Sequence, residues 1–233
     1  MKDWFPFSSY DFYAYLASGS LLIAVADLAF NNGEILARPN WSLVASVVFV
    51  AGAYVLGQLV ASIASPMLEF GLARRFLSPP ADILLRRKVP NRRERALGVL
   101  IGRNYSPYSE AVVSAILDKA GLFLGRDREA LDTESIFLVA HRAAQSSEPT
   151  RARLGDFLNQ YGFCRNIAMV AIFSCAMFFA SAITSDQRKF WLYSAMAAFL
   201  AAGMLLRFLK FYSAFASEVL GSLASIADGP KKS

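Results

Sequence analysis

The chain has 233 residues, of which 55% are hydrophobic and 18% are charged, and its formal net charge is +6. The charged fraction lies below the roughly 25% usual for soluble domains. Residues 39–68, 166–185 and 190–206 contain no Asp, Glu, Lys or Arg. Because a bilayer span needs about 20 apolar residues, these runs indicate an integral membrane protein. They exclude an ordinary cytosolic globule, a disordered chain, a disulfide scaffold and a coiled coil.

The first apolar segment, residues 12–30, is the weakest of four predicted transmembrane helices because Asp27 interrupts it near one end. A signal peptide is the competing interpretation, since Ala24-Val25-Ala26 resembles a small-x-small cleavage site. The preceding residues carry two acids, one lysine and many aromatics, which argues against a signal peptide. We therefore expect a first membrane span here.

The other three spans complete an all-α membrane protein in which a helical cytoplasmic domain is inserted between spans two and three. We expect a first transmembrane hairpin over 1–66, a basic helical domain over 67–161, a second hairpin over 162–212 and a cytoplasmic helix extension and tail over 213–233. The second, third and fourth spans are predicted at about 42–65, 163–184 and 190–212.

The basic residues predict the orientation of these spans. Fifteen of the 24 Lys and Arg residues lie between positions 67 and 161, whereas the short loops on the opposite side hold only Arg38, Arg188 and Lys189. Loops rich in Lys and Arg stay in the cytoplasm. We therefore expect a multi-pass protein of the bacterial inner membrane with both termini in the cytoplasm.

The inserted domain shows helical periodicity. A helix is predicted over 107–124, a second from a cap at Asp132 or Thr133, and a third capped by Thr150 that leads into the third span. The fourth span continues beyond the membrane, with apolar residues at intervals of three or four from Phe208 to Ile226. Because this helix would exceed the hydrocarbon thickness, its last turns are expected in the cytoplasm.

The second span carries small residues four apart, at Ala53, Gly57 and Ala61. Small residues in this register allow close helix approach. Intrachain packing, a subunit interface and a pore-lining face all remain open. Gln58 is the strongly polar residue deep in this span, and it indicates either an ion path or a hydrogen bond between helices.

The densest charge lies in residues 86–95, where six of ten residues are basic. Binding to anionic lipid or control of topology is one interpretation. An anionic, phosphate-rich ligand is the second, because arginine matches phosphate oxygens bidentately, and salt bridges between subunits are the third. The predicted ligand-binding residues, with two from a following Arg-aromatic segment, are Arg86, Arg87, Lys88, Arg92, Arg93, Arg95, Arg103 and Tyr105.

Three further basic residues lie where spans three and four meet the cytoplasm. Arg165, Arg207 and Lys210 are predicted to couple the cytoplasmic helices to the spans. Around Arg165 the segment Tyr161–Asn166 combines aromatic, amide and guanidinium groups, which suits either an interfacial anchor or base stacking with phosphate contacts.

Enzymatic chemistry finds no support in the sequence. It contains no GxxxxGK[ST], GxGxxG or HExxH motif, one histidine and no CxxC pair. We therefore predict a protein that is not an enzyme, with no catalytic residues, no metal and no cofactor.

The layout resembles small four-span membrane effectors of bacterial anti-phage defence, and it is most similar to the membrane effector of Hailong-type systems. The segments that carry the resemblance are Ser9–Leu16, Ala53–Gln58 and Tyr161–Asn166. The resemblance implies a homo-oligomeric channel, favouring a tetramer. Its cytoplasmic part would bind a nucleic-acid or nucleotide signal made by a partner nucleotidyltransferase. In such systems a bound DNA oligomer holds the channel shut, and its loss depolarises the membrane.

A second hypothesis is a non-conducting membrane scaffold whose cytoplasmic domain docks a partner protein. It predicts a stoichiometric complex and no ion flux. A transporter or membrane enzyme is less well supported, because such proteins usually carry buried paired charges or interrupted spans.

Overall fold

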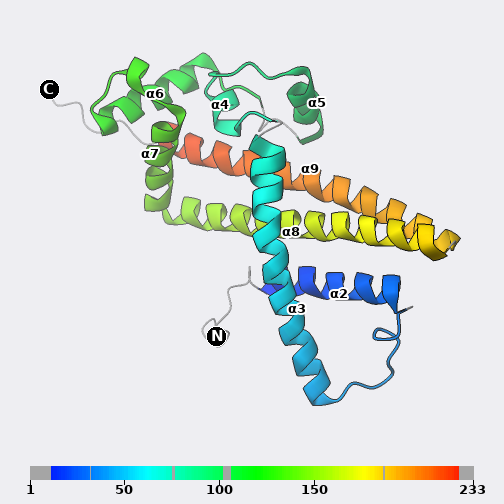
Figure 1. Ribbon diagram of the computed structural model, residues 1–233. Helices are drawn as coiled ribbons and strands as arrows, with labels where there is room; N and C mark the ends of the chain where they lie inside the picture. Colours follow the sequence, from blue (N-terminus) through cyan, green and yellow to red (C-terminus); the bar gives the residue numbers. More distant parts are fainter. Residues whose placement is uncertain (1–11, 32, 75–76, 102–105, 186, 226–233) are drawn as a thin grey trace. The chain divides into compact units, whose positions relative to one another are not determined.

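The computed structural model describes residues 12–31, 33–74, 77–101, 106–185 and 187–225. Within these ranges every regular element is a helix (Figure 1). The elements are η1 (Phe12–Leu16), α2 (Ala17–Phe30), α3 (Leu43–Ala64), η2 (Ser65–Arg74), α4 (Pro80–Leu84), α5 (Arg92–Ile101), α6 (Glu110–Leu124), η4 (Arg128–Ala130), α7 (Thr133–Ser146), α8 (Glu148–Ser185) and α9 (Arg188–Ser225).

The chain divides into two compact units. Unit 1 comprises Met1–Leu72 and Asn159–Phe208, and unit 2 comprises Ala73–Leu158 and Leu209–Ser233. Two boundaries between the units fall inside an α-helix. One lies in α8, between Leu158 and Asn159, and the other lies in α9, between Phe208 and Leu209. Each of these two long helices therefore contributes residues to both units.

Three described helices are long and apolar enough to cross a membrane. They are Leu43–Gly71, Glu148–Ser185 and Arg188–Ser225. The apolar helix over the predicted first span, Ala14–Phe30, is shorter than these. The structure therefore has three candidate membrane-spanning helices, which agrees with a membrane protein.

Unit 1 is held together by a close crossing of the first two apolar helices. Ala53 and Gly57 of α3 are buried, and both lie against the backbone of residues in η1 and α2. A Cβ atom on Gly57 would fall well inside 3.0 Å of the Tyr15 carbonyl oxygen, and one on Gly19 would do the same at the Ala53 carbonyl oxygen. The absence of side chains at these two glycines is what allows the helices to approach.

The helix expected to end near Ser65 continues as the π-helix η2 to Arg74. Pro66, the second residue of η2, has no backbone N–H and its ring clashes with the preceding turn. The wider π-helical turn accommodates this loss without ending the helix. One consequence is that Glu69, beyond the predicted span, remains on the same continuous helix.

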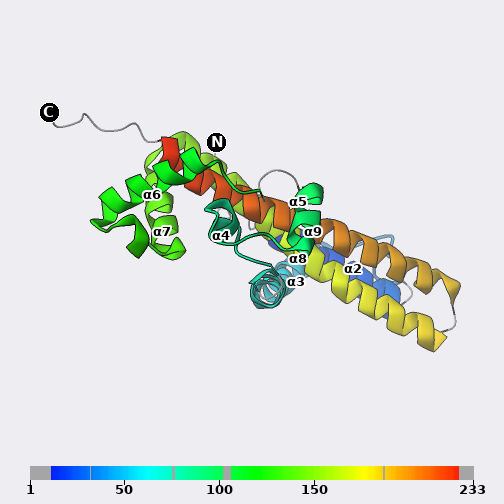
Figure 2. The same cartoon turned by 90° about the horizontal axis from the view of Figure 1, so that it is seen from above.

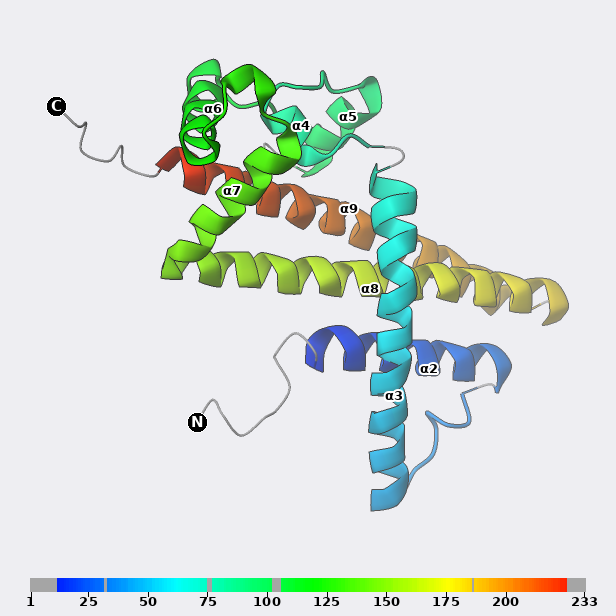
Figure 3. The ribbon, with the colours of Figure 1, turned by 60° about the vertical axis from the view of Figure 1, so that its left-hand side comes forward.

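The helix α3 runs across the direction of α2 and of the unit 1 parts of α8 and α9 (Figures 1, 2 and 3). The C-terminal half of α3 packs on this group, with Val60 and Ala64 buried against Ala168 and Met169 of α8. The described residues leave the first turns of α3 largely uncovered, and Leu43 is 82% exposed. Apolar side chains left uncovered in this way require lipid or another protein chain around them.

Unit 2 is built around the last turns of α9. Val219, Leu220 and Leu223 are fully buried, in one core with Ile116 of α6 and Ile136 of α7. The helix α9 thus continues past the predicted fourth span to Ser225, as the apolar spacing predicts.

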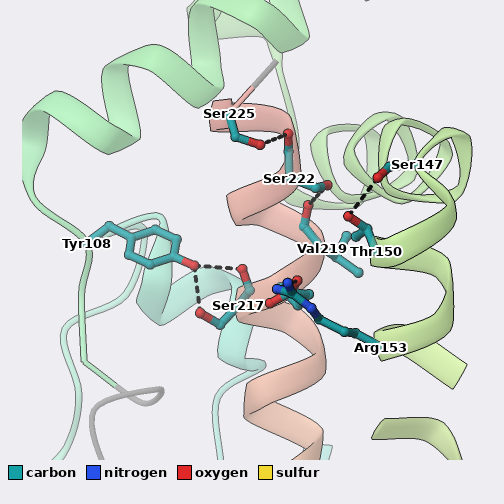
Figure 4. Close-up of polar contacts among 9 residues, drawn as sticks. Tyr108, Ser147, Thr150, Arg153, Ser217, Val219, Ser222 and Ser225 are labelled. Carbon is teal, nitrogen blue, oxygen red and sulfur yellow. Dashed lines mark hydrogen bonds and ion pairs between the residues drawn. The ribbon is translucent and has the colours of Figure 1, made fainter. Parts of the chain in front are cut away.

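Polar contacts fasten the loops and neighbouring helices to α9 (Figure 4). The Tyr108 hydroxyl donates to the Ser217 carbonyl oxygen at 2.9 Å, and Arg153 of α8 pairs with Glu218 at 3.3 Å. Burial raises the pKa of Tyr108 above its usual value, so this phenol stays protonated and available as a donor. The first contact holds Tyr108, which precedes α6, against α9, and the second holds the start of α8 there.

Local caps explain where the unit 2 helices begin and end. Asp132 accepts a hydrogen bond from the Ser135 amide at 3.2 Å and caps α7, as one of the two predicted alternatives requires. Gly125 ends α6 with a left-handed φ of 61°. The prediction that Thr150 caps the next helix is wrong, because α8 already begins at Glu148 and holds Pro149 in its first turn.

Candidate anion-binding surface

The predicted basic cluster lies on the turn between α4 and α5 and on the first turn of α5. Arg86 adopts a left-handed φ of 57°, which is uncommon for a residue other than glycine. Its Nε donates to the Tyr108 carbonyl oxygen at 2.7 Å and its guanidinium pairs with Glu110 at 3.1 Å. Arg86 therefore ties the basic turn to the start of α6.

Three more cations of the cluster make contacts with other residues of unit 2. Arg87 donates to the Leu131 carbonyl oxygen, and Arg95 donates to the Pro90 carbonyl oxygen at 3.3 Å. Lys88 lies 3.9 Å from the Asp82 carboxylate. These side chains are exposed, but each already makes a polar contact within unit 2. They therefore help to stabilise the conformation of the turn.

Arg92 and Arg93 differ from the other cations. Both are exposed, and neither makes a hydrogen bond or ion pair with another described residue. They occupy the first turn of α5, where the positive end of the helix dipole disfavours cations by roughly 0.3–1 kcal/mol each. A bound anion would remove this penalty, because guanidinium groups and the helix terminus would then face the same negative charge.

A buried carboxylate, that of Glu94, holds the loop that carries this surface. Glu94 is 2% exposed and accepts hydrogen bonds from the backbone amides of Ser78 and Asn91, each at 2.6 Å. The contact with Asn91 is one half of a capping box on α5. Glu94 therefore fixes the preceding loop and presents Arg92 and Arg93 outward.

The ionised form of Glu94 is favoured by these contacts. Burial by itself raises the pKa of Glu94, but the hydrogen bonds from Asn91 and Ser78 outweigh it, and Lys88 adds a favourable charge. The resulting pKa lies below the usual value of 4.5. Glu94 is thus negative at neutral pH and stays bonded to both amides.

The remaining predicted ligand residues, Arg103 and Tyr105, lie outside the described residues. The structure therefore brings together six of the eight predicted positions, on one turn and one helix start. Among the described residues, no group of three or more His, Cys, Asp or Glu side chains is arranged to hold a metal ion.

The predicted pore or interface residues lie in unit 1. Ala53 and Gly57 form the close crossing with η1 and α2, and Ala61 is also buried. Gln58 is exposed on α3. The small residues therefore serve packing within the chain, whereas the Gln58 side chain is left exposed.

The predicted coupling residues have different surroundings. Arg165 of α8 forms an ion pair with Glu69 of η2 in which both side chains are largely buried, and its guanidinium lies 5.7 Å from the Tyr161 ring centroid. Arg207 and Lys210 of α9 are exposed. Arg165 thus fastens α8 to the end of the α3–η2 helix.

Sequence reasoning missed two acids that position these cations. The spacing Asn91-x-x-Glu94 is a capping-box pattern and is a signal that identifies Glu94. No local signal identifies Glu69 as the partner of Arg165, because the two residues are 96 positions apart.

Comparison of this chain with protein-family models, with curated protein sequences and with solved structures gives no match.

Proposed function

We propose that this protein is an oligomeric, ligand-gated membrane channel of bacterial anti-phage defence, whose cytoplasmic domain binds a nucleic-acid or nucleotide signal that controls opening and membrane depolarisation. The observation that carries the proposal is the pair Arg92 and Arg93, exposed and without a partner among the described residues at the start of α5. Two such guanidinium groups at a helix N-terminus suit a polyanion with phosphate groups. The defence role rests on the resemblance described above.

The two long helices support coupling between ligand and membrane. The backbone of α8 runs without interruption from unit 2 into unit 1, and that of α9 runs from unit 1 into unit 2. An unbroken helix is stiff, so a change in the environment of its cytoplasmic part has a direct route to its apolar part. In this proposal four spans cross the inner membrane, with Ala14–Phe30 as the first, and both termini lie in the cytoplasm.

The uncovered part of α3 supports oligomerisation. Val44, Val47 and Val48 are 72%, 61% and 65% exposed, so the described part of one chain leaves most of each side chain uncovered. One chain with three or four apolar helices encloses no wide aqueous pore, so conduction requires several copies around a shared axis. A homotetramer, with a nucleotidyltransferase as the source of the signal, is the form that we propose.

A non-conducting scaffold is the second candidate. Leu122 and Phe123 at the end of α6 are 84% and 62% exposed, which is unusual for a cytoplasmic surface and suits a protein contact. A scaffold predicts a stoichiometric complex through this helix end. It predicts no ion flux and no oligonucleotide binding through α5.

Arg92→Ala and Arg93→Ala test the anion-binding surface. We expect each change to weaken binding of a fluorescent single-stranded oligodeoxynucleotide, and to lower the salt slope of log Kd by about 0.7, because each removes one phosphate contact and its counterion release. Fluorescence anisotropy of the full-length protein at several salt concentrations measures both quantities.

Arg142→Ala is the matched control, since Arg142 is an exposed arginine of unit 2 on α7 with no hydrogen bond or ion pair to a described residue. It should leave the affinity within about twofold. Equal effects of all three substitutions would show diffuse attraction to a basic protein and would contradict a site at α5.

A further inference from the structure

A polar pocket lies within unit 1, between the first helix, α3 and α8. It has a volume of about 410 Å³ and is lined by Tyr15, Gln58, Ala61, Ser62 and Arg165. Three of the five lining residues come from adjacent turns of α3. The pocket therefore places amide, hydroxyl and guanidinium groups together in a unit whose helices are mostly apolar.

The pocket lies at one boundary of the apolar part of α8. Arg165 precedes the uncharged run 166–185, which ends with the helix at Ser185. Twenty residues of α-helix span about 30 Å, close to the thickness of the hydrocarbon core. In the membrane topology proposed above, on which this inference rests, the Arg165 guanidinium lies at the level of the lipid headgroups on the cytoplasmic side.

The donors in the pocket exceed the acceptors that the protein provides. A guanidinium carries five N–H groups, and Arg165 uses one in its pair with Glu69 and one in a 3.4 Å bond to the Asn166 amide oxygen. Gln58 makes no hydrogen bond with another described residue. The lining itself contains no carboxylate, and Glu69 offsets part of the Arg165 charge from outside it.

The neighbouring residue Asn166 contacts the Arg165 side chain. Its side chain is fully buried, and its Nδ2 finds no acceptor among the described residues. A buried polar group is seldom retained without a role, because leaving it unpaired costs about 1–3 kcal/mol. The Asn166 Oδ1 accepts the hydrogen bond from the Arg165 Nε. This bond orients the guanidinium beside the pocket.

We propose that this pocket binds the phosphodiester group of an anionic molecule at the inner surface of the membrane. The Arg165 guanidinium supplies charge and a donor fork, and the Gln58 amide donates to a further phosphate oxygen. The Ser62 hydroxyl, which donates to the Leu59 carbonyl oxygen at 2.8 Å, exchanges this bond for one to the phosphate. Two sources carry this chemistry, namely the headgroup of an inner-leaflet phospholipid and a soluble nucleotide. Basic pockets between transmembrane helices on the cytoplasmic side are sites of the first kind.

Lipid retention by the full-length protein tests this proposal. The protein is exchanged into mixed micelles of phosphatidylglycerol and phosphatidylcholine, and native mass spectrometry counts each lipid bound per protomer. We expect phosphatidylglycerol to be enriched, and Gln58→Leu with Ser62→Ala to lower this enrichment about tenfold, since bonds to charged groups contribute about 1.5–3 kcal/mol each. These substitutions leave the Arg165–Glu69 pair intact.

Ser46→Ala is the control, because Ser46 is a hydroxyl on α3 outside the pocket whose Oγ donates to the Ser42 carbonyl oxygen. A parallel arm measures the thermal shift given by a soluble dinucleotide. Equal retention of both lipids, with a dinucleotide shift lost in the pocket variant, assigns the soluble source. If the pocket variant retains phosphatidylglycerol as well as the wild type does, and shows the same dinucleotide thermal shift, the proposal is overturned.

Discussion

Substitution of Gly57 by alanine is expected to disrupt unit 1, despite being a change of one methyl group. The new Cβ would overlap the Tyr15 carbonyl oxygen and lie 2.7 Å from the Tyr15 Cα. These are backbone atoms of a packed helix, so neither can rotate away, and α3 must separate from η1. Overpacking of this kind costs about 3 kcal/mol, and we expect the melting temperature to fall by about 10 °C.

Gly52→Ala is the matched control on the same helix. A Cβ at Gly52 meets no atom within 4 Å, and alanine is the better helix former by about 0.5–1 kcal/mol. Thermal unfolding of the purified protein in detergent, with size-exclusion chromatography, compares the two variants. Equal melting temperatures for Gly57→Ala and Gly52→Ala would contradict the close crossing.

Removal of the Glu94 carboxylate is expected to loosen the loop beneath the anion-binding surface. Glu94→Ala leaves the amides of Ser78 and Asn91 without their acceptor, and bonds to a charged group contribute about 1.5–3 kcal/mol each. A loss of about 3 kcal/mol raises the local opening constant roughly a hundredfold. Hydrogen exchange of peptides covering residues 77–101 measures this opening directly.

The same carboxylate makes the loop sensitive to acid. Because the pKa of Glu94 is lowered in the folded protein, ionisation stabilises the fold fully above the unfolded value of 4.5. This stabilisation is lost as pH falls below 4.5 toward the lowered folded pKa. In the wild type, protection of residues 77–101 should therefore decrease over that range, and in Glu94→Ala it should not change further.

Glu129→Gln provides the comparison, since Glu129 is an exposed acid of the same unit. Its exchange pattern should match that of the wild type. Unchanged protection at residues 77–101 in Glu94→Ala would show that the two amides find other acceptors and that Glu94 does not hold the surface.

Periodic and local features of the fold follow from the sequence. The apolar spacing through Phe208, Val219 and Leu223 predicts a helix that continues beyond the span, and α9 does so. The helix ending at Gly125 and the helix capped by Asp132 were also predictable. These features depend on neighbours within one or two turns, so the necessary information lies in a short window.

Features that depend on distant partners were not predictable. Pro66 indicates a helix end, yet the chain continues through it as a π-helix. The density of arginine in residues 86–95 does not distinguish Arg86, which bonds to a residue 22 positions away, from Arg92, which has no partner among the described residues. The crosswise direction of α3 depends on Gly19 and Gly57 meeting another backbone, which neither glycine reveals alone.

The account depends most on the link between anion binding at α5 and ion passage through an assembled membrane domain. Potassium flux from proteoliposomes at low salt, with and without a single-stranded oligodeoxynucleotide on both sides of the bilayer, tests that link. We predict flux above that of protein-free vesicles in the wild type, at a rate that the oligonucleotide changes, and no such response in the Arg92→Ala/Arg93→Ala double variant. Flux equal to that of protein-free vesicles under both conditions, or flux that ignores the oligonucleotide, would contradict the account.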